Sequence, residues 1–259
     1  FFLATKSNEF EWITLLYVVF CMIFARSAAM AFNRYIDRDI DAANSRTAQV
    51  REIPNGSIKA NSALIFVIIN SLLFVTTTYL INSLCFLLSP IALLVILGYS
   101  YTKRFTALCH LILGLGLALA PIGAYLAVTG EFDVIPLLFS VAVLFWVSGF
   151  DIIYSLQDQE FDKEQTLHSI PVLIGTKNAL NLSKTLHFLT FSALSIAGSF
   201  GDFSLYYWIG FGIFTTLLIY QHILVKHNDL SKVNLAFFTT NGIGSVIFGV
   251  FVIADLLIQ

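Results

Sequence analysis

The chain has 259 residues, of which 58% are hydrophobic and only 12% are charged, and its mean hydropathy is +0.83. These values exclude an ordinary water-soluble domain, in which about a quarter of the residues carry charge. A net charge of −2 gives no reason to expect a nucleic-acid partner.

Apolar stretches of about 20 residues recur along the chain, each long enough for a membrane-spanning helix. They are continuously apolar and do not alternate as the strands of a β-barrel do. The predicted fold class is therefore all-α, a polytopic membrane helical bundle, and the short connections predict that residues 1–259 form a single domain. The eight predicted spans cover residues 12–36, 60–82, 84–101, 106–128, 134–157, 179–200, 204–225 and 233–257.

Basic residues gather in alternate loops. Twelve of the fourteen lysines and arginines lie in the loops after the first, third, fifth and seventh spans or at the helix ends beside them, and the other loops between spans contain none. Because positively charged loops stay on the cytoplasmic side of a membrane, we expect these loops to face the cytoplasm. The expected location is a bacterial inner membrane.

A first acidic cluster lies where the first span ends. Asn33, Asp37 and Asp41 are four residues apart, so on a helix they would fan over about 80° of one face, with Asp39 pointing away. Arg26 lies within about 20° of the Asn33 direction. A charged Arg at that depth should face the bundle interior or a watery cavity, where it would clamp an aromatic carboxylate or form an internal ion pair.

A second acidic cluster lies where the fifth span ends. Asp151, Asp158 and Asp162 would fall within about 40° of one another on a helix. Tyr154 borders that face, and Glu160 points nearly the opposite way. Asp151 lies about two turns deeper in the membrane than Asp158. On the loop charges above, both clusters are expected on the cytoplasmic side.

Oxygen ligands with few histidines and no cysteine nearby suit a hard cation, Mg²⁺ before Zn²⁺. Mg²⁺ often completes its coordination with substrate phosphates, and basic side chains beside both clusters would bind phosphate oxygens. The pattern therefore predicts a Mg²⁺-diphosphate site, against the simpler alternative of surface ion pairs. Its candidate metal ligands are Asn33, Asp37, Asp41, Asp158 and Asp162, and its candidate diphosphate ligands are Arg46, Lys103, Arg104 and Lys163.

The remaining polar residues carry weaker signals. The five histidines, His110 among them, show no ligand spacing, and only His168, in the basic loop after the second cluster, could contact phosphate. Asp255 is near the end of the last apolar stretch, so we expect it to reach the membrane interface.

The first cluster resembles the motif N-D-x-x-D-x-x-x-D of the UbiA family of intramembrane prenyltransferases. Asn33, Asp37 and Asp41 match it, and Arg34 replaces its first Asp. The segment from Tyr99 to Arg104 resembles the Y-x-x-x-K-R of the same family.

The second cluster resembles the motif D-x-x-Y-x-x-x-D-x-x-x-D of the 4-hydroxybenzoate branch, with Asp151, Tyr154, Asp158 and Asp162 in its four positions. The resemblance covers essentially the whole chain. Family members typically have nine spans, and this chain opens without an initiator Met, so we expect its first span to be missing.

The resemblance implies transfer of a polyprenyl group from an allylic polyprenyl diphosphate to an aromatic acceptor, 4-hydroxybenzoate or a related hydroxy-aromatic acid, in quinone biosynthesis. Asp37 and Asp158 would then assist loss of diphosphate, and Asp151 would be the base that activates the acceptor. Arg26 and Tyr154 would contact the acceptor.

Two alternatives remain open at this point. A naphthoate acceptor on a menaquinone route would use the same metal site. A cation-coupled membrane transporter would also need carboxylates, but transporters usually place them near the middle of the bilayer. Neither the prenyl length nor the oligomeric state is predicted.

Overall fold

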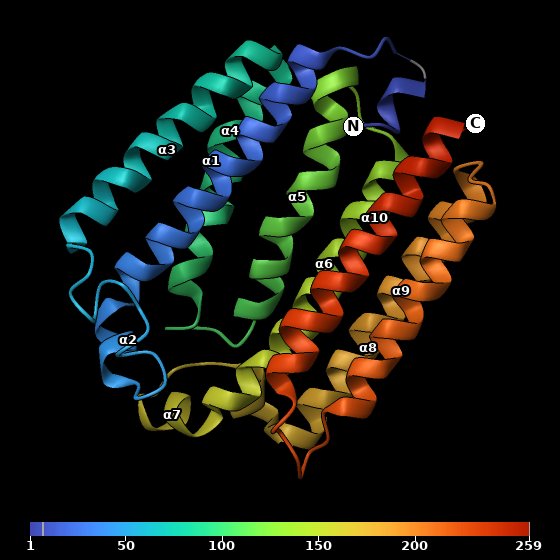
Figure 1. Cartoon of the computed structure of the whole chain (residues 1–259). Helices are drawn as coiled ribbons and strands as arrows, with labels where there is room; N and C mark the ends of the chain where they lie inside the picture. The colour runs from blue at the N-terminus through green and yellow to red at the C-terminus, as the bar shows by residue number, and fades with distance from the viewer. Residues whose placement is uncertain (7, 259) are drawn as a thin grey trace.

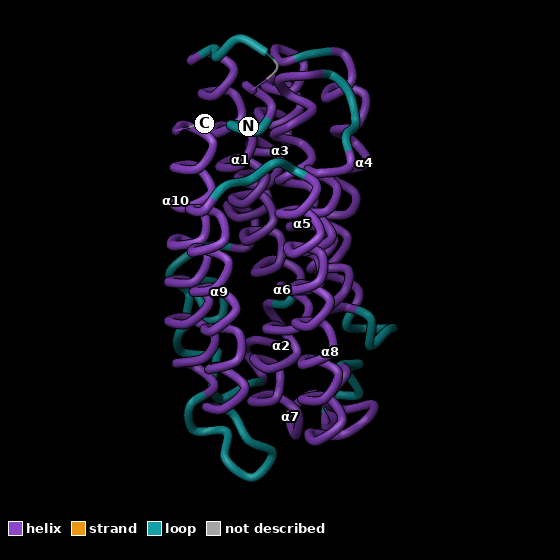
Figure 2. Tube along the Cα trace, turned by 90° about the vertical axis from the view of Figure 1, so that its right-hand side faces the viewer, coloured by secondary structure: helices purple, strands orange, loops and turns teal. Residues whose placement is uncertain are grey.

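The computed structural model describes residues 1–6 and 8–258, and within these ranges the elements of regular structure are all helices (Figure 1). The long helices run side by side along one axis, which Figure 2 shows from a second direction. This confirms the predicted all-α bundle.

The first half of the chain contributes η1 (Ala4–Lys6), α1 (Trp12–Ile36), α2 (Arg38–Ala43), α3 (Ala60–Ile81), α4 (Ser83–Thr102) and α5 (Cys109–Thr129). The second half contributes α6 (Val134–Ser155), η2 (Leu156–Asp158), α7 (Gln159–Glu164), α8 (Ile170–Phe200), α9 (Leu205–Leu224), the π-helix η3 (Leu235–Thr240) and α10 (Asn241–Ile258).

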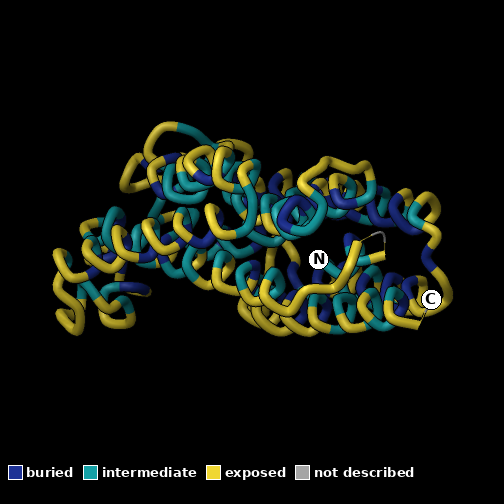
Figure 3. The backbone as a smooth tube through the Cα atoms, turned by 90° about the horizontal axis from the view of Figure 1, so that it is seen from above, coloured by how far each residue is buried: buried dark blue, intermediate teal, exposed yellow. Residues whose placement is uncertain are grey.

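The packing order follows the chain. Helix α1 packs on α3 and α4, helix α9 packs on α10, and α6 packs on both α5 and α8. Helix α6 therefore joins the two halves of the bundle. Figure 3, a view from above, shows exposed residues along the outer sides of the helices. Many of them are large and apolar, such as Leu87 and Leu94, which are 71% and 73% exposed, as expected for side chains that face lipid.

Seven helices in the described ranges are long and apolar enough to cross a membrane, so this is an integral, multi-pass membrane protein. They coincide with seven of the eight predicted spans. The remaining prediction, 179–200, lies inside α8, whose Asn, Ser, Thr and His residues lower its hydropathy.

The polar side chains of α8 are turned into the bundle. The hydroxyl of Ser183 donates to the carbonyl oxygen of Gly149 at 2.7 Å, and that of Thr190 donates to the carbonyl oxygen of Ala142 at 3.3 Å. Since buried hydroxyls need such partners, α8 joins the bundle through polar contacts with α6 that a hydropathy pattern does not register.

Asp255, which the sequence predicted to reach the membrane interface, has a fully buried side chain. It accepts hydrogen bonds from the backbone N–H groups of Ser204 and Tyr207, at 2.9 and 3.1 Å, and from the Ser204 hydroxyl. These groups belong to the start of α9, whose first N–H groups have no partners within the helix. Asp255 of α10 therefore caps α9.

Candidate active site

The two acidic clusters meet at one end of the bundle, where Figure 1 shows α2 and α7 near each other. The side-chain amide of Asn44, which follows α2, donates to Oδ1 of Asp158 at 3.1 Å, although the two residues are 114 positions apart. The sequence prediction that both clusters lie on the same side of the membrane agrees with this arrangement.

Neither cluster lies on one continuous helix, however, so the angles predicted between their side chains around a helix do not apply. Helix α1 ends at Ile36, and Asp37 has φ −89° and ψ 5° before α2 begins. The second cluster is interrupted by the 3₁₀ turn η2, and Asp158 has φ −105° and ψ 4°. Because a 3₁₀ turn has three residues per turn instead of 3.6, Asp158 and Asp162 are rotated away from the line that a continuous α-helix would give them.

Asp37 is the centre of the first cluster and is only 3% exposed. The Lys103 ammonium lies 3.0 Å from its Oδ2, and the Arg104 guanidinium lies 3.2 Å from its Oδ1. Asn33 also donates to Oδ2, at 2.9 Å. A nearly buried carboxylate is tolerated only with such partners, so the residues matching two separate motifs form one ion-pair cluster.

Asp158 is the centre of the second cluster and is held by Arg46. Nε of Arg46 donates to Oδ1 of Asp158 at 2.9 Å, and Nη2 donates to Oδ2. The remaining nitrogen of the guanidinium, Nη1, donates to the hydroxyl of Tyr154 at 3.2 Å. The Tyr154 ring in turn lies 4.1 Å, centroid to centroid, from the ring of Phe237 in η3. The site therefore has an aromatic wall beside its charged part.

Lys103 connects the two clusters. Besides its ion pair with Asp37, it interacts electrostatically with Asp41 of α2 and with Asp162 of α7. The charge of Lys103 thus acts on three of the predicted metal ligands, from both motifs, although only Asp37 is in direct contact with it.

Asp41 carries the observation that favours a bound cation. Its side chain is 8% exposed, and Oδ2 has no hydrogen-bond partner in the part of the chain that the structure describes. Burial raises the pKa of Asp41 above its ordinary value, and Lys103 opposes this only in part. An unpaired, buried carboxylate oxygen is costly, and a hard divalent cation would satisfy it.

The donor set fits Mg²⁺ on chemical grounds, since it consists of carboxylate and amide oxygens. Across residues 1–6 and 8–258, no three side chains of His, Cys, Asp or Glu are gathered so as to hold a metal ion among themselves. Mg²⁺ ordinarily takes one or two carboxylates and completes its shell with water and substrate phosphates. A site of that kind needs no preformed group of three.

Asp151 lies apart from these ion pairs, in α6, and its partner is a residue to which the sequence gave no role. Its Oδ2 lies 2.7 Å from Nδ1 of His110, the second residue of α5. His110 is 3% exposed, whereas the Asp151 side chain is 23% exposed. A single histidine without a spaced partner carries no signal in the sequence, so only the packing of α5 on α6 reveals this pair.

Two predicted site residues are not drawn into these clusters. Lys163, at the end of α7, is exposed and makes no ion pair within the described residues. Arg26 is exposed on α1, and the internal ion pair that the sequence allowed for it is absent from the same part of the chain. Its assignment as a clamp for an aromatic carboxylate stays a prediction.

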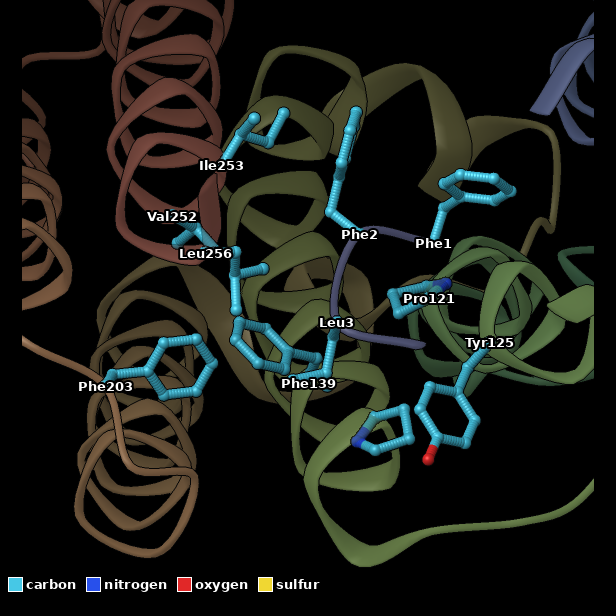
Figure 4. Close-up of a pocket in the computed structure, with 11 residues that line it drawn as sticks. Phe1, Phe2, Leu3, Pro121, Tyr125, Phe139, Phe203, Val252, Ile253 and Leu256 are labelled. Carbon is cyan, nitrogen blue, oxygen red and sulfur yellow. The ribbon is translucent and has the colours of Figure 1, made fainter. Parts of the chain in front are cut away.

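A pocket of about 250 Å³, whose lining residues are drawn in Figure 4, lies away from the charged clusters. Aromatic and aliphatic side chains line it, among them Phe2, Tyr125 and Phe203, and none of the predicted site residues does. This pocket is therefore separate from the candidate site.

Known proteins are similar to this chain over most of its length. The model of the family described as "UbiA prenyltransferase family" matches residues 1–243. The 4-hydroxybenzoate octaprenyltransferase of Tolumonas auensis is 30% identical over 223 residues, which are 86% of this chain and 77% of that protein. That of Francisella tularensis subsp. tularensis is 29% identical over 91% of this chain and 81% of its own length.

Solved structures show the same fold. The apo structure of a UbiA homolog from Aeropyrum pernix K1 superposes with a TM-score of 0.89 at 28% identity, covering 98% of this chain and 94% of that one. A UbiA homolog from Archaeoglobus fulgidus, bound to DMAPP and Mg²⁺, has a TM-score of 0.66 at 20% identity and covers 93% and 90% of the two chains.

Proposed function

Because this chain belongs to the UbiA prenyltransferase family, we propose that it transfers a polyprenyl group from a polyprenyl diphosphate to 4-hydroxybenzoate or a related hydroxy-aromatic acid in quinone biosynthesis. The protein is a prenyltransferase enzyme embedded in a membrane, and the transporter alternative falls away with the family. The proposed location of the site is the cytoplasmic face of a bacterial inner membrane, since the basic loops surround it.

The observation that carries the proposal is that the basic residues of the site neutralise its carboxylates. Lys103 and Arg104 bind Asp37, and Arg46 binds Asp158. Such a set of paired charges can take up an anionic diphosphate together with a cation, because each base can move from a carboxylate oxygen to a phosphate oxygen. Lys163 would join them from α7.

Asn33, Asp37, Asp41, Asp158 and Asp162 would hold Mg²⁺ ions, with one or two carboxylates to each ion. When bound, the ions would supply positive charge that offsets the charge developing on the diphosphate.

The chain's own residues account for the remaining chemistry. Arg46, Lys103 and Arg104 stabilise the diphosphate as the bond between the allylic carbon and its oxygen breaks and both electrons leave with the oxygen. The allylic carbon then forms a bond to an electron-rich carbon of the aromatic ring. Asp151 accepts the phenol proton of the acceptor, which raises the electron density of that ring, and the ring proton is lost to solvent. Tyr154 and Arg26 would position the acceptor.

Two observations support a hydroxybenzoate as the acceptor. The relatives above are named as 4-hydroxybenzoate octaprenyltransferases, and the second motif has Tyr154 between Asp151 and Asp158. A naphthoate acceptor would suit the same charged groups and is the second candidate.

The test is a prenyl-transfer assay with the purified protein, Mg²⁺ and one polyprenyl diphosphate, offered 4-hydroxybenzoate, other hydroxybenzoates or a hydroxynaphthoate. Preference for hydroxybenzoates supports the proposal, whereas a product formed only with the naphthoate would make the naphthoate the acceptor.

D37N and D158N should each abolish turnover while the protein stays folded. D39N is the matched control, since Asp39 is 87% exposed and pairs only with the neighbouring Arg38 among the described ion pairs. Full activity in D37N and D158N would refute the site.

A further inference from the structure

The buried imidazole of His110 joins three helices around the reactive carboxylate Asp151. His110 itself is near the start of α5, Asp151 is on α6, and the backbone N–H of Ile170, the first residue of α8, lies 3.3 Å from Nε2 of His110. The Ser148 hydroxyl of α6 also donates to the His110 carbonyl oxygen, at 3.1 Å. Of the two ring nitrogens, Nδ1 has Asp151 as its partner and Nε2 has Ile170.

These contacts assign the hydrogen on the ring. The Ile170 N–H is a donor, so Nε2 of His110 must accept and carries no hydrogen. Nδ1 then carries the hydrogen of the neutral ring. It donates that hydrogen to Oδ2 of Asp151, at 2.7 Å. A histidine held in one tautomer in this way orients the carboxylate that it contacts.

The two oxygens of Asp151 become different as a result. Oδ2 is occupied by His110, whereas Oδ1 has no hydrogen-bond partner in residues 1–6 and 8–258 and belongs to a side chain that is 23% exposed. One oxygen is therefore anchored in the bundle and the other is available to a bound molecule.

We propose that His110 is a positioning residue for the proposed reaction: it anchors Oδ2 of Asp151 through Nδ1 so that Oδ1 accepts the phenol proton of the aromatic acceptor. This rests on the proposed function, because it presupposes a hydroxy-aromatic acceptor. The acceptor O–H bond breaks, its electron pair stays on the phenol oxygen, and the proton goes to Oδ1. His110 gains no proton in this step, because Nδ1–H is already a donor and Nε2 is held by Ile170.

A second consequence concerns α8. The backbone N–H of His168, two residues before α8, donates to the carbonyl oxygen of Lys103 at 2.7 Å. The loop that leads into α8 is therefore tied to the diphosphate side of the site at His168 and to the acceptor side at Ile170. His110 provides the second of these ties.

The test compares H110A with H110N. Alanine removes both ring contacts, whereas the amide of asparagine replaces the Nδ1–H donor. For H110A we expect kcat to fall about 100-fold, the size of effect that misplacing a reacting group by about 1 Å produces. KM for the prenyl diphosphate should not change, because its proposed ligands are untouched. H110N should recover kcat to within about tenfold of the wild type.

The matched control is S148A. Ser148 is fully buried at the same contact of α5 and α6, and its hydroxyl donates to the backbone oxygens of His110 and Leu144 and not to the imidazole ring. Its activity should stay near that of the wild type. A loss in S148A equal to that in H110A would mean that helix packing, and not the ring contact, is what matters.

A double variant separates orientation from any independent role. If His110 acts only through Asp151, H110A should lower kcat no further in a D151N background. Should H110A fail to fold, H110Q replaces it, because its longer amide lies where Nε2 stood and misses Asp151. H110N active and H110Q slow would support the proposal, and the reverse order would overturn it.

Different results would overturn the role of His110 and the proposed function. A wild-type enzyme that prenylates hydroxy-aromatic acids while H110A keeps kcat within twofold would overturn the role of His110 alone. A wild-type enzyme that prenylates none of these acids would overturn the proposed function and this inference with it.

Discussion

Arg46 holds both carboxylate oxygens of Asp158 across 112 residues of sequence, with Nε 2.9 Å from Oδ1 and Nη2 donating to Oδ2. Each carboxylate oxygen has two lone pairs, and Oδ1 of Asp158 already accepts hydrogen bonds from both Arg46 and Asn44. If Asp158 is a metal ligand, we expect the cation to compete with Arg46 for this carboxylate as substrate binds. The freed guanidinium would then be placed to receive a phosphate group, which it can bind with two parallel hydrogen bonds.

Replacing Arg46 tests this exchange. R46A should lower kcat/KM for the polyprenyl diphosphate by roughly 10- to 100-fold, the effect of losing about 1.5–3 kcal/mol of charged hydrogen bonding. R46K should recover little, because an ammonium cannot reproduce the planar two-oxygen contact. Steady-state kinetics at saturating Mg²⁺ measures both.

The control for that series is R51A, since Arg51 lies in the same loop and makes no ion pair within the described residues. Equal losses in R46A and R51A would show that only the general charge of the loop matters.

Asp41 should destabilise the metal-free protein at neutral pH. Burial raises its pKa, so the folded state disfavours the ionised form. The stability associated with protonated Asp41 is therefore fully present below the ordinary Asp pKa and is lost as pH rises through the raised value. Because an asparagine at this position does not ionise, D41N avoids the loss of stability that ionised Asp41 causes. In EDTA at neutral pH it should raise the melting temperature by roughly 2–4 °C, the shift for about 1 kcal/mol in a chain of this size. The matched D39N should melt as the wild type does, and a D41N protein that melts lower would contradict the prediction.

Magnesium should stabilise the wild type in a pH-dependent way. Protons and the cation compete for Asp41, so the rise in melting temperature on adding Mg²⁺ should shrink as pH falls through the raised pKa of that carboxyl. In D41N the rise should be smaller and should vary less with pH. Thermal unfolding of both proteins at several pH values, with Mg²⁺ or EDTA, measures the difference. An identical Mg²⁺ effect in the two proteins would exclude Asp41 as a ligand.

Gly149 should tolerate no side chain. A Cβ at this position would lie 2.4 Å from Nε2 of His187. The His187 ring cannot easily move away, because its Nδ1 lies 2.7 Å from Nε2 of His222 and its Nε2 lies 3.2 Å from the carbonyl oxygen of Trp146. G149A should therefore cost about 1–3 kcal/mol of stability.

The matched control for G149A is G212A on α9, where a Cβ would meet nothing within 4 Å. Thermal unfolding should show a clear decrease for G149A and little change for G212A, and similar melting temperatures for the two would contradict the packing argument.

Much of the fold could be predicted because hydropathy is a property of each segment. Long apolar stretches must be helical in a bilayer, since every backbone polar group needs a partner there. The prediction is weakest at α8, because hydroxyls and histidines that bind α6 make it look too polar. The partners of Asp255 could not be predicted for a related reason, since they lie at the start of α9, 48 to 51 residues away.

The candidate site, like the fold, could be predicted from the sequence only in part. The order and spacing of Asp37, Asp41, Asp158 and their neighbours could be read along the chain, and with them the family and the class of reaction. The interruptions of the helices at Asp37 and in η2 could not be predicted from the sequence. They replace the regular rotation per residue from which the directions of side chains around a helix are calculated. Nor could the partners be predicted: Arg46 for Asp158, Lys103 for Asp37 and His110 for Asp151 come from segments 41 to 112 residues apart. Chemical types and local spacing are written in the chain, whereas pairings arise from helix packing, which depends on all the segments together.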